Sequence, residues 1–284
     1  VKGIMETASL DPLGDRLKAI ERVEAGRCTN PELPVIARLD GRAFSTFTRG
    51  LKRPYDPQLS DLMIASTKHL VHKFHALIGY TQSDEITLAW EPTEDFMFGG
   101  RYQKLTSLLA ASVTGFFQKN LDVMLPEKSG WIPLFDCRVW QPASMEELYL
   151  NFLWRQDDAM KNSVNSAASL YCSHKQLMGV SRSERLVLLE KHGINWEDYP
   201  PAFKWGTFVK AKNVLVDASA FDGADIPEKY RPTEPVIRTV VEELEVGPLR
   251  RLENPAALLF AKKDETLPVN RISSAAEVSS EGSM

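Results

Sequence analysis

The chain has 284 residues, of which 43% are hydrophobic and 25% are charged, and its formal net charge is −4. These values are ordinary for a globular protein, and the charge argues against a surface covered in cations, although a nucleic-acid site needs only a local basic face. We expect neither a membrane span nor a signal peptide, because no apolar run is long enough. Cys28, Cys137 and Cys172 form no C-x-x-C pair, so we expect a cytoplasmic protein without disulfides or a zinc knuckle.

The first part of the chain predicts two helices separated by a strand. Residues 11–26 begin with Asp-Pro, a helix-start dipeptide, and carry an apolar stripe at helical spacing. Residues 35–39 are a short apolar run that predicts a strand, which is followed by Asp40 and Gly41. Residues 56–77 again begin with Asp-Pro and have helical periodicity, so they predict the second helix.

A β-hairpin follows the second helix. Residues 78–82 and 86–90 are rich in strand formers and flank the polar tip Ser-Asp-Glu at 83–85. Residues 99–119 have helical periodicity, and residues 131–139 predict a fourth strand. The order is βαββαβ, which predicts an α+β fold with a ferredoxin-like palm, an antiparallel sheet with its helices on one face.

This topology predicts a paired-carboxylate metal site. In a βαββαβ sheet the first and third strands are antiparallel neighbours, so Asp40 at the end of the first strand meets Asp84 at the start of the third. Asp84 and Glu85 must point apart, so only one of them can share a site with Asp40. Two carboxylates on a sheet suit metal-assisted phosphoryl or nucleotidyl transfer. The alternative is that both acidic segments are ordinary solvated turns.

The rest of the chain predicts a helical and β-hairpin extension. Residues 144–174 have helical character with spaced cations and amides, which suits contact with an RNA backbone or, equally, a subunit interface. Residues 181–193 contain a capping box and end at a glycine. Residues 203–212 resemble a basic hairpin, residues 234–246 predict an edge strand, and residues 273–284 predict a disordered tail.

Five separate segments resemble the tRNA-histidine guanylyltransferase family. They are Arg-Leu-Asp-Gly-Arg-Ala-Phe at 38–44, Arg-Pro at 53–54, Tyr-Thr-Gln-Ser-Asp-Glu at 80–85, Phe-Asp-Cys-Arg-Val at 135–139 and Trp-Arg-Gln at 154–156. The segments occur in the family's order with matching gaps, from about residue 34 to residue 212. The family includes bacterial and archaeal guanylyltransferase-like members that act as 3′-to-5′ polymerases.

The resemblance implies a role for individual residues. It implies catalytic roles for Asp40, Asp84 and Glu85, and two magnesium ions held by Asp40, the carbonyl of Gly41, and Asp84. It implies nucleotide contacts along the first and third strands and on the helix that begins near residue 99: Arg38, Asp40, Gly41, Arg42, Ala43, Phe44, Ser45, Ser83, Asp84, Arg101 and Lys104. We further expect RNA contacts from the extension, at Arg155, Lys161, Asn162, Lys204 and Lys210.

The domains implied are a catalytic palm with its N-terminal helix (1–140), an extension that contacts RNA and triphosphate (141–272) and the tail (273–284). The activity implied is magnesium-dependent addition of nucleotides to the 5′ end of tRNA, with ATP and GTP as substrates, by a homotetramer. Residues 160–166 depart from the eukaryotic block and resemble the bacterial branch, which favours templated 5′-end repair over strict histidine-tRNA selection. The alternatives are a palm-type nucleotidyl cyclase, which needs no RNA, and a catalytically silent RNA-binding module.

Overall fold

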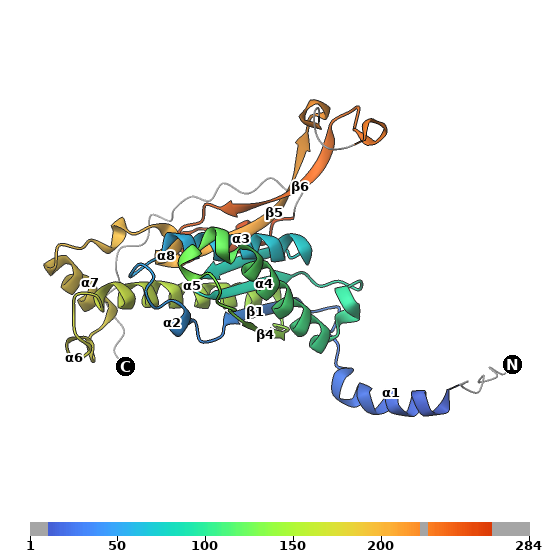
Figure 1. Ribbon diagram of the computed structural model, residues 1–284, viewed down its shortest axis with the longest axis horizontal. Coiled ribbons are helices and arrows are strands. Elements are labelled where there is room, and N and C mark those ends of the chain that lie inside the picture. The colour runs from blue at the N-terminus through green and yellow to red at the C-terminus, as the bar shows by residue number, and fades with distance from the viewer. Residues whose placement is uncertain (1–10, 222–226, 263–284) are drawn as a thin grey trace.

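A computed structural model of the protein describes residues 11–221 and 227–262 (Figure 1). Its first half contains the predicted βαββαβ arrangement, in which four strands form an antiparallel sheet in the order β4-β1-β3-β2. The predicted α+β fold class and palm topology are therefore confirmed. The elements are β1 (Val35–Gly41), α2 (Phe44–Phe47), α3 (Pro57–Lys73), β2 (Ile78–Gln82), β3 (Glu85–Trp90), α4 (Tyr102–Met124) and β4 (Phe135–Trp140).

Helices α3 and α4 cover one face of this sheet. Alternate residues of β1, including Val35 and Leu39, point into the core beneath these helices, where they meet Leu70 of α3 and Phe117 of α4. Asp56 caps α3, because its carboxylate accepts hydrogen bonds from the backbone N–H groups of the first turn. The predicted fourth strand begins at Phe135, four residues later than expected, because the preceding segment is irregular and exposes apolar side chains.

A long helix, α5 (Met145–Ala168), lies on the opposite face of the sheet. Its apolar side chains, among them Leu148 and Phe152, pack on Ile36 of β1 and Tyr80 of β2. The predicted helical region 144–174 is thus one helix followed by a short separate one. The sheet is consequently a layer between α3 and α4 on one side and α5 on the other.

The C-terminal strands extend the same sheet. Strand β5 (Thr207–Val216) pairs with β2, and β6 (Val236–Leu244) pairs with β5 as the predicted edge strand. The predicted basic hairpin at 203–212 is wrong, since these residues form the end of helix α8 and the start of β5. The expected boundary near residue 140 therefore falls within one continuous six-stranded sheet. The outer parts of β5 and β6 form an arm that projects from the body (Figure 1).

Short helices complete the described chain. Between α5 and β5 they pack into a small cluster of their own around Leu189 and Trp196. The predicted capping box is present, with Ser181 and Glu184 bonded reciprocally. The remaining helices are α6 (His174–Leu177), α7 (Arg182–Lys191), α8 (Pro201–Trp205), α9 (Pro255–Phe260), and the 3-10 turns η1 (Met97–Gly100), η2 (Pro126–Lys128), η3 (Trp196–Asp198), η4 (Ala218–Phe221), η5 (Glu228–Tyr230) and η6 (Leu249–Arg251).

The N-terminal helix α1 (Pro12–Ala25) has the predicted amphipathic pattern but projects away from the sheet (Figure 1). None of its residues is buried against the described chain. Its apolar stripe is exposed to between 51% and 80%, at Leu13, Leu17, Ile20 and Val23.

Within residues 11–221 and 227–262, no helix has the length and hydropathy of a membrane span. The expected tail at 273–284 lies outside the described residues.

Candidate active site

Asp40 and Asp84 lie together where β1 ends and β3 begins. The backbone N–H of Gly41 donates to the carbonyl oxygen of Asp84 at 3.1 Å, which ties the hairpin tip to the end of β1. Burial, followed by the negative charge of Asp40, raises the pKa of the Asp84 carboxyl to about 6. Ser83 partly opposes this shift by donating a hydrogen bond to the carboxylate at 3.1 Å. The structure thus brings the two predicted carboxylates within electrostatic reach of each other.

Two residues beside these carboxylates have left-handed backbone conformations. Ala43, between β1 and α2, has φ of 57°, and Ser83 at the hairpin tip has φ of 50°. Such conformations are strained for residues other than glycine and tend to cluster at functional sites. Both residues are among the predicted nucleotide contacts, and they position α2 and Asp84 respectively.

Gly41 is required by packing. A Cβ atom there would lie 2.3 Å from the ring of Phe44, so a larger residue would displace that ring. Phe44 is buried and contacts the rings of Phe47, Phe117 and Phe135. Phe44 therefore belongs to the core, where its side chain is not available for the expected nucleotide contact. Arg42 and Ser45 are exposed next to it.

Glu85 lies opposite Asp40 in the ladder between β1 and β3, and its carboxylate is engaged by α5. Both of its oxygens accept hydrogen bonds from Arg155 of α5, each at 2.7 Å. The side chains of the pair are each 10% exposed, and Arg155 also bonds to Asp158 at 3.1 Å. The expectation that Arg155 contacts RNA is therefore wrong for this conformation, because its guanidinium is buried and occupied.

Arg38 lies on the same sheet face as Asp40, two residues earlier on β1. Its guanidinium lies over the rings of Trp140 and Trp154, at 5.7 and 5.6 Å from their centroids, and 4.0 Å from a Glu85 oxygen. The side chain is only 18% exposed. Arg38 is thus close to the carboxylates but largely enclosed by these partners.

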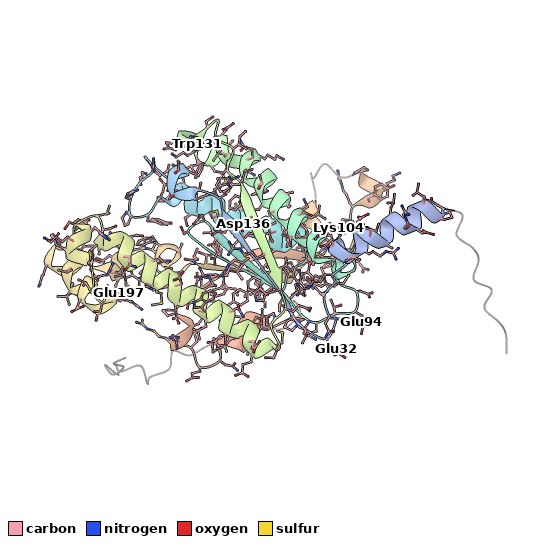
Figure 2. The ribbon with its side chains drawn as sticks, turned by 90° about the horizontal axis from the view of Figure 1, so that it is seen from below. Glu32, Glu94, Lys104, Trp131, Asp136 and Glu197 are labelled. Carbon is pink, nitrogen blue, oxygen red and sulfur yellow. The ribbon has the colours of Figure 1, made fainter. Side chains whose placement is uncertain are left out.

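Arg101 and Lys104 lie at the opposite end of the sheet from Asp40. They begin α4, whose Tyr102 bonds to Gln141, just beyond the end of β4 that pairs with the start of β1. Six residue steps along β1, about 20 Å, separate that end from Gly41. Figure 2 shows Lys104 beside the base of α1, away from Asp136, the residue that pairs with Asp40. Within a single chain, Arg101 and Lys104 are therefore too far from Asp40 to act at the same site.

A cavity of about 400 Å³ opens between the hairpin tip and α5. The predicted nucleotide contacts Ser45 and Ser83 line it, together with the predicted RNA contact Asn162. Its remaining wall includes two cations and two aromatic side chains: Lys52, Arg53, Tyr55 and Phe203. This volume and mixed lining suit a small polar ligand with a planar ring.

Sequence reasoning missed several of these positions. Arg53 stands in one of the five segments that resemble the family, but no contact was predicted for it or for Lys52 and Tyr55, and no periodic signal marks Phe203. Asp136 was overlooked as well, although its register opposite Asp40 places a third carboxylate on the same sheet face. Alternation along residues 135–139 was the signal that could have identified it.

Of the other four residues expected to contact RNA, two are buried and two are exposed. Lys204 and Lys210 are 6% and 4% exposed, and they donate to the backbone carbonyls of Glu197 and Leu259. They stabilise the fold from inside, so the expectation that they contact RNA is wrong. Lys161 and Asn162 are exposed on α5. Only these two of the five remain as candidates.

The chain is similar to known proteins of one family. A family model described as tRNAHis guanylyltransferase matches residues 15–143, which include Asp40, Asp84 and Glu85. A solved bacterial tRNA(His) guanylyltransferase-like protein in complex with ATP is 30% identical, with a TM-score of 0.64 over 70% of this chain and 87% of its own. The solved tRNA(His) guanylyltransferase of Saccharomyces cerevisiae shares the fold at 24% identity, with a TM-score of 0.62 over 67% of this chain and 91% of its own.

Relatives by sequence point the same way. The tRNA(His) guanylyltransferase of Candida glabrata is 23% identical over 224 residues, which are 72% of this chain and 94% of that protein. The family model covers the candidate site, and the identity to the bacterial protein extends over most of both chains. The chain therefore belongs to the tRNA-histidine guanylyltransferase family.

Proposed function

We propose that this protein is a magnesium-dependent nucleotidyltransferase that adds nucleotides in the 3′-to-5′ direction to the 5′ end of a tRNA. The observation that carries the proposal is the proximity of Asp40 and Asp84: the hairpin tip is hydrogen-bonded to the end of β1, and burial together with the charge of Asp40 raises the pKa of Asp84. Membership of the family and the ATP-bound bacterial relative support the same conclusion. The three cysteines are free, which fits a reducing cytoplasm.

The donor set fits magnesium. Among the described residues no group of three or more His, Cys, Asp or Glu side chains could hold a metal ion. Mg²⁺ usually takes only one or two protein carboxylates and completes its shell with water and substrate phosphates. Asp40, Asp84 and the carbonyl of Gly41 would hold two such ions, and a shared cation would relieve the repulsion between the two carboxylates.

The chemistry needs no covalent intermediate on the protein. A 5′-monophosphate on the RNA first attacks the α-phosphorus of ATP and releases pyrophosphate. The 3′-hydroxyl of the incoming nucleotide then attacks the activated 5′-phosphorus and releases AMP, or releases pyrophosphate where the RNA already carries a 5′-triphosphate. Bound magnesium would neutralise the charge that develops on the phosphate oxygens. The cavity beside Ser83 would hold the nucleoside, with Tyr55 or Phe203 against the base and Lys52 or Arg53 near its phosphates.

The exposed part of α5 is the proposed RNA contact. In the block that distinguishes this chain from eukaryotic members, Met160 and Ser163 are buried, whereas Lys161 and Asn162 face outward. Neither exposed residue carries an aromatic ring that could stack on an exposed base of one particular tRNA. We therefore infer that base pairing with the opposing strand, rather than reading of one tRNA identity, selects the added nucleotide.

We also propose that α1 contacts a second copy of the chain within a tetramer. A helix of 14 residues with an exposed apolar stripe is only marginally stable by itself in water. Its N-terminal half carries Asp15, Arg16 and Lys18, a net charge of +1, and its C-terminal half carries Glu21, Arg22 and Glu24, a net charge of −1. An antiparallel pair of α1 helices would cover both stripes and bring these opposite charges together.

The first prediction concerns the carboxylates. Asp40→Asn and Asp84→Asn are each expected to lower nucleotide addition by at least about 100-fold, because each removes a metal-binding charge at constant volume. The assay combines magnesium, ATP, labelled GTP and a 5′-truncated tRNA. Asp122→Asn, on the exposed side of α4, is the control and should keep full activity. Normal turnover in either site variant would remove Asp40 or Asp84 from the mechanism, and GTP consumption without tRNA would favour a cyclase.

The second prediction concerns pH and the metal-free protein. Since the pKa of Asp84 is about 6 in the folded chain and near 4 in the unfolded chain, its ionisation lowers stability above pH 6, and this effect disappears as the pH falls towards 4. Asp84→Asn should therefore raise the free energy of unfolding by roughly 1–2 kcal/mol at pH 8 in EDTA. Denaturant melts at pH 8 and pH 4 measure the difference, which should be absent at pH 4. An equal gain at both pH values would contradict this electrostatic origin.

The third prediction tests template dependence. The added base should follow its partner on the 3′ strand, in truncated tRNAs of several identities, because Watson–Crick pairing makes the selection. Changing the opposing nucleotide and sequencing the extended product measures this dependence. Guanosine added whatever stands opposite, and only to histidine tRNA, would instead identify a dedicated guanylyltransferase.

The fourth prediction concerns α1. Leu17→Glu should reduce the molecular mass in solution, measured by light scattering, because a carboxylate in the stripe opposes helix pairing. Val187→Glu, which alters an aliphatic side chain of similar exposure on α7, serves as the control. A native mass in the Leu17 variant would show that α1 is not the contact between copies.

A further inference from the structure

The pair of Glu85 and Arg155 joins the hairpin that carries Asp84 to the helix on the other side of the cavity. We propose that Glu85 acts as a positioning residue for Asp84, through Arg155, and is not itself a metal ligand or general base. This inference rests on the proposed function, since it assigns Asp84 to the metal site.

Both carboxylate oxygens of Glu85 are engaged by the guanidinium of Arg155, which competes with a metal ion for them. Nε of Arg155 bonds to one oxygen and Nη2 to the other, each at 2.7 Å, and Nε of Arg38 lies 4.0 Å from the second. Binding a metal would require Glu85 to leave Arg155, and the guanidinium would then stay buried with only Asp158 as its carboxylate partner. Separating a buried ion pair in this way is strongly unfavourable. Glu85 is therefore held in place as a structural partner.

The location of Glu85 lets this contact control the site. Glu85 follows Asp84 directly in the chain and pairs with Asp40 across the ladder between β1 and β3. A bidentate pair fixes both the distance and the orientation of the two groups it joins. Any displacement of Glu85 therefore moves Asp84 relative to Asp40, and the separation of these carboxylates decides how well a metal ion fits between them.

The same contact sets the width of the cavity. Ala159 and Asn162 follow Arg155 at helical spacing, so they lie on the same face of α5, and both line the cavity. Gln82 and Ser83 line it from the hairpin. One wall of the cavity therefore belongs to the hairpin and the other to α5, and the Glu85–Arg155 pair joins these two elements. Loosening it should weaken nucleotide binding as well as metal binding.

A double-mutant cycle tests the inference. Glu85→Gln keeps the side-chain size, Arg155→Gln leaves a shorter polar side chain, and these two variants and the double variant all remove the ion pair. Each single variant should lose about 10- to 100-fold in nucleotide addition and need more Mg²⁺ for half-maximal rate, because misplacement by about 1 Å has effects of that size. The double variant should lose no more than the worse single variant, since all three lack the same contact.

Metal binding without RNA or nucleotide gives an independent readout. Titration with Mn²⁺ should show a lower affinity in both single variants and in the double variant, to a similar degree, while melting curves verify that each is folded. Asp157→Asn is the matched control. Asp157 lies on the same helix and forms a similar bidentate pair with Arg250, but the side chains are 35% and 66% exposed and the pair lies away from the hairpin. Its Mn²⁺ affinity and activity should be those of the wild type.

Two results would overturn the inference. In one, Glu85→Gln removes activity while Arg155→Gln leaves it normal; in the other, the losses of the single variants add in the double variant. Either would mean that Glu85 acts directly on metal or substrate. If the wild type adds no nucleotide to tRNA but the three variants share the same fall in Mn²⁺ affinity, the proposed function fails and the positioning role of Glu85 stands.

Discussion

The buried ion pair between Glu85 and Arg155 is the contact on which the arrangement of this site depends. It crosses from the sheet to α5, and the neighbours of Arg155 in the Trp-Arg-Gln segment hold two other parts of the molecule. Trp154 lies against Arg38 of β1, and Gln156 accepts a hydrogen bond from the backbone N–H of Leu249 at 2.6 Å. One turn of helix therefore fixes the hairpin, the first strand and the C-terminal segment relative to one another. Buried pairs of this kind contribute little net stability compared with apolar packing, but they specify one geometry.

The site combines features that oppose folding with surroundings that stabilise it. Two carboxylates repel each other at the end of the sheet, and Ala43 and Ser83 have strained backbone conformations. Directly beneath, the aromatic cluster of Phe44, Phe117 and Phe135 is almost fully buried and supplies the apolar contacts that hold α2 and β1 in place. The strained residues are thus attached to a rigid core, which keeps the carboxylates together before any ligand arrives.

Burial explains where reasoning from charge patterns succeeded and where it failed. Cationic side chains at 155, 204 and 210 suggested an RNA surface, yet each donates hydrogen bonds inside the protein. A lysine or arginine has the same letter in the sequence whether its partner is a phosphate or an internal carbonyl group. Similarly, Arg101 and Lys104 have suitable spacing on one helix, but spacing does not reveal which end of the sheet that helix begins at.

The sequence by itself determined the palm and the meeting of Asp40 with Asp84. The periodicities of strands and helices are local properties of the sequence, so the elements could be identified from it. The order βαββαβ leaves few ways to pair the strands, so the pairing of β1 with β3 could be predicted from the order of the elements. Only the tertiary structure decided that Glu85 belongs to Arg155, 70 residues away, that β5 and β6 extend the palm sheet, and that the apolar stripe of α1 faces away from the core. These outcomes depend on how distant elements compete for the same partners and the same buried space, which no local pattern in the chain records.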